Sequence, residues 1–355
     1  RLFLDIRSSI SQQRISDRGD LAFDNTTDTD NRTDVTTFSL VPRFNLPLGR
    51  FATVNATVSE SQLQFSSDAV DSGRTQNVAV SVQNGSRFNK LNWDMSINQT
   101  RDYEAGSTLR DYQLGLAYRV RPKLRLTFST GYEDSTLDTA ADIPEDSGIW
   151  SVGAAWTIDR RQSLSASIGN RYNTQTYSLA YARQGRYGAI GVDYTETRTT
   201  SRAIQAEEFE VFDDNGEPIF SLLLPSITTE VFLQKTLSAS FSWARARTSW
   251  SASASNETRE FQLAGTTDEV FSLSGRLGYR FSDRISSSVS ASWQEQSFGL
   301  DGRKDEILRL TLGTSFDLGR DMGVAFNLSH NERSSSDSTL NFDANTVSLG
   351  LTARF

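Results

Sequence analysis

Apolar and polar residues alternate one by one along most of the chain. The pattern is clearest in residues 91–97, 112–120 and 271–281, where Leu, Trp, Met, Ile, Tyr or Phe recurs at almost every second position. Successive side chains of a β-strand point to opposite faces, so this period predicts strands with one apolar and one polar face. Further alternating rows begin at or near Leu124, Trp150, Leu308, Val324 and Val347.

Two kinds of connection separate these strands. Longer polar loops are expected at residues 17–34, 66–73, 136–147 and 333–339, and between them fall short turns, which are expected at residues 46–49, 85–86, 122–123, 160–161, 184–185, 282–283 and 319–320. Short turns at one end and longer loops at the other are typical of bacterial up-and-down barrels. We therefore predict an all-β fold, a transmembrane antiparallel up-and-down β-barrel that occupies residues 1–355 as one domain. About 18 strands fit the chain, each supplying the roughly 9–11 membrane residues that a tilted strand needs.

A soluble β-sandwich would give the same alternation, because it also buries one face of each strand. The absence of linkers and the Ser, Asn, Thr, Gly and Arg of the polar face favour a barrel with a wet lumen. Hydrophobic residues are only 37% and mean hydropathy is -0.45, which a barrel tolerates because half its residues face the lumen. No apolar run is long enough for a transmembrane helix.

The remaining composition narrows the chemistry. The chain has no Cys, which excludes thiolate metal sites and disulfides, and a net charge of -8 gives no reason to expect nucleic-acid binding. The acidic residues 28–34 match no EF-hand spacing, so we expect no metal and no cofactor. Aromatics make up 10% of the residues, and those at strand ends fit interfacial girdles: Tyr112, Tyr118, Trp150, Trp156, Tyr279 and Phe355.

The closing strand, residues 347–355, resembles the terminal strand of Gram-negative outer-membrane β-barrels. The barrel insertion machinery recognises that strand and its final Phe, so the resemblance implies an insertion signal made of Val347, Leu349, Leu351 and Phe355. It also implies the bacterial outer membrane as the location, with membrane lipid and lipopolysaccharide as surroundings.

Residues 3–13, 33–42 and 49–53 are similar to segments of the PEP-CTERM and exopolysaccharide-associated outer-membrane β-barrel family, as are residues 216–219 and the closing strand. The resemblance implies a full-length barrel of about 22 strands, with N-terminal strands ahead of residue 1. The lack of a leader before the strand-like first residues agrees with this expectation. The resemblance further implies a wide channel linked to polysaccharide export, with export or periplasmic proteins as partners, and it brings no catalytic residues.

Arginines recur on the polar faces of the predicted strands, mostly near the short turns. They form a set of pore-lining candidates: Arg119, Arg121, Arg125, Arg276, Arg280 and Arg309. One interpretation is a cationic zone that selects or orients anionic solutes. The alternative is a set of structural arginine–carboxylate ladders, for which Asp94, Asp283 and Asp317 are available.

The connection at residues 199–228 is far longer than the others and mixes acids with apolar residues. Loops of this length usually have a function of their own or are disordered. The segment either folds into the lumen as a constriction or caps the barrel on the extracellular side. Its constriction candidates are Glu207, Glu208, Glu210, Asp213 and Asp214.

His330 is the sole histidine and the one candidate for triad-like chemistry, but no nucleophile motif accompanies it. We therefore expect no enzyme. The sequence favours an outer-membrane channel associated with exopolysaccharide export. The alternatives are a general or solute-specific porin and a structural barrel that houses a partner protein.

Overall fold

The computed structural model describes residues 1–14, 32–67, 72–104, 106–136, 146–171, 174–200, 231–261, 264–319 and 322–353. These residues form eighteen strands and one short 3-10 helix. The elements are β1 (Leu2–Arg14), β2 (Arg32–Leu48), β3 (Ala52–Phe65), β4 (Gly73–Asn84), β5 (Leu91–Asp102), β6 (Ser107–Arg121), β7 (Leu124–Thr136), β8 (Asp146–Asp159), β9 (Gln162–Arg171), β10 (Thr174–Gln184), β11 (Gly188–Thr200), β12 (Val231–Arg245), β13 (Thr248–Phe261), β14 (Thr267–Ser282), β15 (Ile285–Ser297), β16 (Lys304–Asp317), β17 (Met322–Ser335), η2 (Ser338–Leu340) and β18 (Phe342–Ala353).

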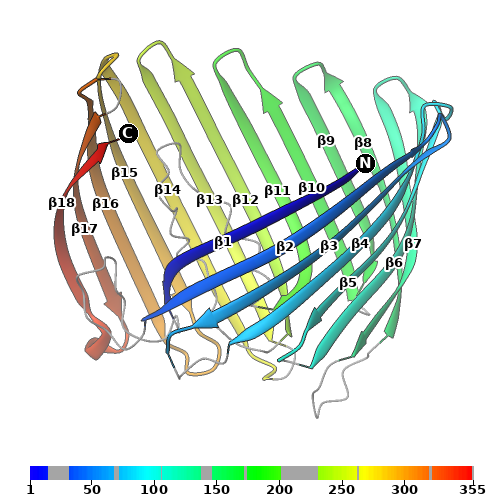
Figure 1. Cartoon of the computed structure of the whole chain (residues 1–355), viewed down its shortest axis with the longest axis horizontal. Helices are drawn as coiled ribbons and strands as arrows, with labels where there is room; N and C mark the ends of the chain where they lie inside the picture. Colours follow the sequence, from blue (N-terminus) through cyan, green and yellow to red (C-terminus); the bar gives the residue numbers. More distant parts are fainter. Residues whose placement is uncertain are drawn as a thin grey trace.

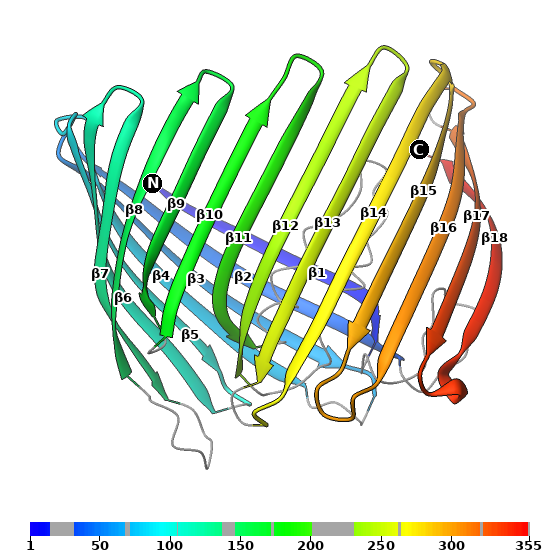
Figure 2. The ribbon, with the colours of Figure 1, turned by 180° about the vertical axis from the view of Figure 1, so that it is seen from behind.

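Each strand pairs antiparallel with the next strand in sequence, from β1–β2 to β17–β18. The single sheet curls into a barrel-like wall, which Figure 1 and Figure 2 show from opposite sides. Within the described residues no pairing joins β1 to β18, so the wall is not closed. The predicted fold class, an up-and-down sheet of about 18 strands, is confirmed.

The two ends of the wall differ as the sequence predicts. Consecutive strands are joined at one end by short turns, such as residues 122–123, 160–161 and 246–247, and this end, the turn end, is uppermost in Figure 1. Longer connections lie at the opposite end, which we call the loop end. One predicted turn is displaced: β2 continues to Leu48, with Pro47 opposite Thr53, and the chain turns at residues 49–51. Gly49 takes a positive φ of 63° there, a conformation that favours glycine.

The register assigns every strand an outer apolar face. Leu273 of β14, Trp293 of β15 and Leu308 of β16 are paired in one row, and Leu273 is 49% exposed. Exposure rises at the two edges of the sheet, to 74% for Leu2 and 76% for Leu349, because an edge strand has a neighbour on one side only. Such a belt of exposed apolar side chains is stable against lipid and costly in water.

In the described part of the chain, no helix is long and apolar enough to cross a membrane.

The buried core lies on the inner face, near the loop end. Val35 of β2, Leu63 of β3, Phe232 of β12, Val270 of β14 and Ile307 of β16 all point inward and are almost completely buried. Inner-face residues nearer the turn end are polar, and many of them are exposed. The lumen wall therefore has a covered half at the loop end and an accessible half at the turn end.

Candidate channel lining

Serine is the commonest residue on the inner faces of four neighbouring strands, β12 to β15. We call this surface the serine wall. It consists of Ser238, Ser240, Ser242, Ser249, Ser251, Ser253, Ser255, Ser272, Ser274, Ser286, Ser288, Ser290 and Ser292. Pairs of hydroxyls meet across the strands, as at Ser253 and Ser274, whose oxygens are 2.7 Å apart. A hydroxyl both donates and accepts hydrogen bonds and carries no charge. The serine wall therefore offers short, uncharged polar side chains to the lumen.

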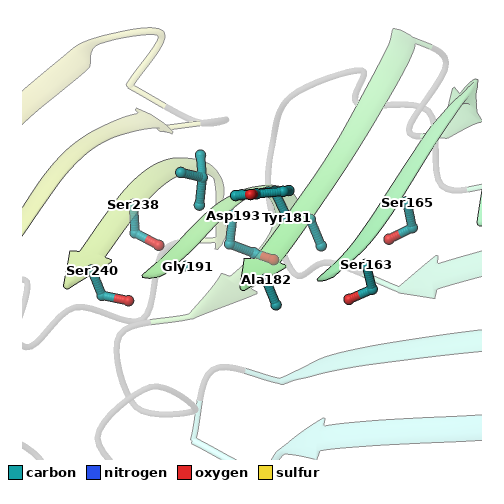
Figure 3. Close-up of a pocket in the computed structure, with 10 residues that line it drawn as sticks. Ser163, Ser165, Tyr181, Ala182, Gly191, Asp193, Ser238 and Ser240 are labelled. Carbon is teal, nitrogen blue, oxygen red and sulfur yellow. The ribbon is translucent and has the colours of Figure 1, made fainter. Parts of the chain in front are cut away.

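A hollow of about 290 Å³ lies on the inner face of β9 to β12, next to the serine wall. It forms where Ala182 of β10 stands opposite Gly191 of β11, because neither residue carries a side chain that fills the space. Serine hydroxyls from β9 and β12 surround it, together with the carboxylate of Asp193 (Figure 3). The hollow offers hydroxyls and one carboxylate to a passing solute.

The predicted pore-lining arginines near the turn end of β6 and β7 do not all lie on one face. Arg119 of β6 stands opposite Arg125 of β7, and both are exposed on the inner face. A register shift between Arg119 and Arg121 brings Arg121 opposite Leu124, whose partner on β8 is the outward Trp156. The bulge therefore sets Arg121 on the lipid side, outside the lumen lining.

The other candidates face the lumen. Arg276 and Arg280 both lie on the inner face of β14, and Arg276 donates a hydrogen bond to the hydroxyl of Ser288 at 3.1 Å. Arg309 of β16 is deeper, and its Nε donates to Oδ1 of Asn331 at 2.7 Å. Their role in selecting solutes stays a prediction.

The carboxylates considered as ladder partners are used differently. Asp94 lies against Gly115, where a Cβ atom would be 2.5 Å from its Oδ1, and Asp317 accepts a hydrogen bond from the backbone of Gly319. Among the described residues, no ion pair joins Asp94, Asp283 or Asp317 to the predicted arginines.

Ion pairs that the sequence did not reveal lie on the inner face near the loop end. Arg333 of β17 donates to Asp305 of β16 at 2.6 Å, and both side chains are fully buried. Arg259 and Glu257 form a similar buried pair within β13. Arg171 of β9 approaches Asp111 and Glu133, the facing acids of β6 and β7, at 3.9 Å and 3.5 Å. The partners in these ion pairs are either two residues apart on one strand, as in Arg259 and Glu257, or on different strands, as in Arg333 and Asp305.

The outer face carries the predicted girdle residues and His330. Tyr112, Tyr118, Trp150, Trp156 and Tyr279 all lie outward and are between 42% and 52% exposed. His330 is outward on β17, with Nδ1 3.1 Å from Oδ1 of Asn345 and 3.6 Å from a carboxylate oxygen of Asp343.

The third polar neighbour of His330 is Glu332, at 3.9 Å. Within the described residues, the polar contacts of His330 are therefore two carboxylates and an amide, and none is a hydroxyl nucleophile. The arrangement gives no support to a triad.

Several predictions concern residues outside the described ranges. Glu207, Glu208, Glu210, Asp213 and Asp214 are among them, so the constriction at residues 199–228 stays a prediction. Of the proposed insertion signal, Val347, Leu349 and Leu351 form an exposed outward row on β18, and Phe355 lies beyond the described residues.

Comparisons with known proteins agree with a porin-like barrel. Residues 235–355 match a family model described as "Putative beta-barrel porin 2". No curated protein matches the sequence. The family match, the polar inner face and the exposed apolar outer belt define a porin-like β-barrel of the bacterial outer membrane. Its association with exopolysaccharide or PEP-CTERM systems stays a prediction.

Solved structures with similar folds include outer-membrane proteins of two bacteria. OccK10 (OpdN) of Pseudomonas aeruginosa is 12% identical, with a TM-score of 0.43 over 100% of this chain and 98% of that one. OprD of the same organism is 10% identical, with a TM-score of 0.43 over 99% and 93%. OmpT of Vibrio cholerae is 11% identical, with a TM-score of 0.40 over 87% and 99%. Similarity at this level says nothing about the substrate.

Proposed function

We propose that this protein is a passive outer-membrane channel through which a hydrated polysaccharide leaves the cell. The serine wall is the observation that carries the proposal. A sugar hydroxyl that moves along serine hydroxyls exchanges one hydrogen bond for another, and the net energy of each exchange is small. Conduction requires sites that bind weakly enough to release, and a small uncharged hydroxyl meets that requirement.

The predicted arginines complete the lining in this proposal. Arg119, Arg125, Arg276 and Arg280 place positive charge near the turn end, and Arg309 lies deeper in the lumen. Two of these arginines share cross-strand rows with the serine wall. Arg276 lies opposite Ser251 and Ser290, and Arg309 lies opposite Ser292. A general or solute-specific porin is the alternative, and it shares the polar lining but not the ability to pass a long chain.

The test compares linear and compact polymers in proteoliposomes. Purified protein is reconstituted, and release of entrapped linear dextran is measured beside release of a compact, cross-linked sugar polymer of the same hydrodynamic radius. We expect linear dextran to leave and the compact polymer to stay. Passage of disaccharides with retention of both polymers would favour a porin. Retention of all solutes, with a stoichiometric partner in the purified sample, would favour a scaffold.

A pair of neighbouring substitutions tests the wall itself. Ser253→Phe puts a bulky apolar group into the lumen, whereas Ala252→Phe adds the same group to the lipid face of the same strand. We expect dextran flux to fall for Ser253→Phe and to be unchanged for Ala252→Phe. Equal flux through both variants would contradict a route along the serine wall.

A further inference from the structure

Three cationic residues stand in one row at the turn end of the inner face: Lys90, which directly precedes β5, Arg119 of β6 and Arg125 of β7. Arg119 is directly opposite Arg125, and the Arg119 amide donates to the Lys90 carbonyl at 2.8 Å, which puts Lys90 opposite Arg119 on the other side. All three residues are exposed. We call Lys90, Arg119 and Arg125 the basic row. Lys90 is not among the pore-lining residues predicted from the sequence, because it precedes the alternating segment 91–97.

Like charges placed directly opposite each other on neighbouring strands are destabilising. Near the loop end, several inner-face arginines are paired with acids, as in the buried pair of Arg333 with Asp305. Among the described residues, no ion pair with a carboxylate includes a member of the basic row. Asp94 shares their face, but it is level with Gly115, which is roughly 13 Å along the strand from Arg119.

Cations outnumber acids around the whole turn end. Its described turns contain Arg50, Arg87, Lys123, Arg160, Arg161, Arg186, Arg247 and Arg284, whereas the acids at this end are Asp159, Asp283 and Asp317. Many inward acids lie near the loop end instead and include Asp102, Asp111, Glu133, Glu257, Asp268 and Asp305. Several of these acids are paired with arginines, so the excess of positive charge lies at the turn end.

We propose that the basic row is the entry site for an anionic polysaccharide, which binds through oxyanion groups on its sugars. This inference rests on the proposed export function and adds the charge class of the substrate. Guanidinium groups bind carboxylate, sulfate or phosphate oxygens through paired hydrogen bonds. Short turns of bacterial barrels face the periplasm, so the row lies where an exported chain enters. The serine wall then carries the chain onward.

Single-channel recording in planar bilayers tests the proposal. The probes are oligogalacturonate, which carries carboxylates, a sulfated dextran, and a neutral dextran of matched length. Because the chain has no Cys, a Ser86→Cys variant lets a bulky impermeant thiol reagent report which compartment the turn end faces. We expect brief current blocks when an anionic probe is added on the turn side, at a rate that falls as salt screens the charges.

Two double variants with the same change in net charge separate the basic row from general electrostatics. Arg119→Ser with Arg125→Ser removes the facing pair from the lumen, and Arg121→Ser with Arg183→Ser removes two outward arginines at the same end. We expect the first to lower the blocking rate of anionic probes about tenfold at low salt. The control is expected to change it by less than about twofold, and Arg119→Lys with Arg125→Lys to keep most of it.

Neutral dextran flux shows whether each variant has folded and distinguishes the two proposals. If wild-type protein passes no dextran, the export function fails. If dextran passes normally but anionic probes block wild type and the Arg119/Arg125 variant equally, or block only from the loop side, the entry site is overturned. Blocking by either the carboxylated or the sulfated probe supports the site, and the stronger probe identifies the acid group.

Discussion

The buried carboxylate of Asp305 offers the sharpest test of how the loop end is held together. Its Oδ2 accepts from Arg333 at 2.6 Å and lies 3.2 Å from Arg303, and its Oδ1 accepts from the Ser335 hydroxyl at 2.6 Å. Asp305 and Arg333 are fully buried. Asp305→Asn keeps the shape of the side chain but removes the charge that both guanidinium groups share.

The expected cost follows from burial. Removing the charge of one partner in a buried ion pair typically costs about 3–5 kcal/mol. The Ser335 hydroxyl still has an acceptor in the asparagine carbonyl, so its share of the loss is small. We therefore expect Asp305→Asn to lower the free energy of unfolding by about 3–5 kcal/mol.

Equilibrium unfolding in lipid vesicles, followed by tryptophan fluorescence against guanidinium concentration, measures this difference. Asp343→Asn is the matched control, because this carboxylate pairs with His330 at 3.6 Å but is 68% exposed. We expect the control to cost less than about 1 kcal/mol. A loss below about 1 kcal/mol for Asp305→Asn would refute the argument that burial makes this ion pair important.

Three further predictions concern other parts of the wall. Val289→Arg puts a charge on the lipid face of β15 and is expected to lower the free energy of unfolding in vesicles by about 2–4 kcal/mol. Ser290→Arg changes the next residue, which faces the lumen, and is expected to lower it far less; equal losses for the two variants would contradict the assigned faces. His330→Ala is expected to leave dextran flux unchanged, and purified protein is expected to lack esterase activity; activity that His330→Ala abolishes would revive the enzyme hypothesis. Asp337 accepts hydrogen bonds from the side chain and the amide of Thr339, and these bonds hold the pKa of Asp337 below its usual 3.8. The stability that they add to η2 is therefore present above pH 3.8 and is lost as pH falls through the lower pKa of the folded state. The protection factor of the Thr339 amide, which divides out the intrinsic pH dependence of exchange, is expected to fall in that window. A protection factor that does not change with pH and equals that of Asp337→Asn would contradict the linkage.

Much of the architecture follows from local sequence. The alternation from Phe271 to Phe281 predicts a strand and its outward row, and β14 has both. The turn at residues 122–123 and the longer connections at the loop end are also visible in the sequence, because Pro, Gly and polar residues interrupt the period. The position of the turn after Pro47 could not be predicted in this way, because the end of an alternating pattern does not fix the last residue that pairs with the next strand.

The candidate site was only partly predictable. The sequence indicates that Arg119 and Arg125 share the polar face, but not that they stand directly opposite each other. It assigns Arg121 to the same face because the period of two continues through it. A bulge adds one residue to a strand and changes which residues oppose each other, so a local period cannot predict its effect.

The sequence alone therefore determined the strands, their apolar outer rows and the hairpin order, because each depends on residues close together in the chain. Tertiary structure decided the meeting of Lys90 with Arg119, the outward turn of Arg121 and the burial of Asp305 with Arg333. These features depend on the register between strands and on what covers a side chain. Both are set by cross-strand hydrogen bonds and by packing between segments that no local pattern relates.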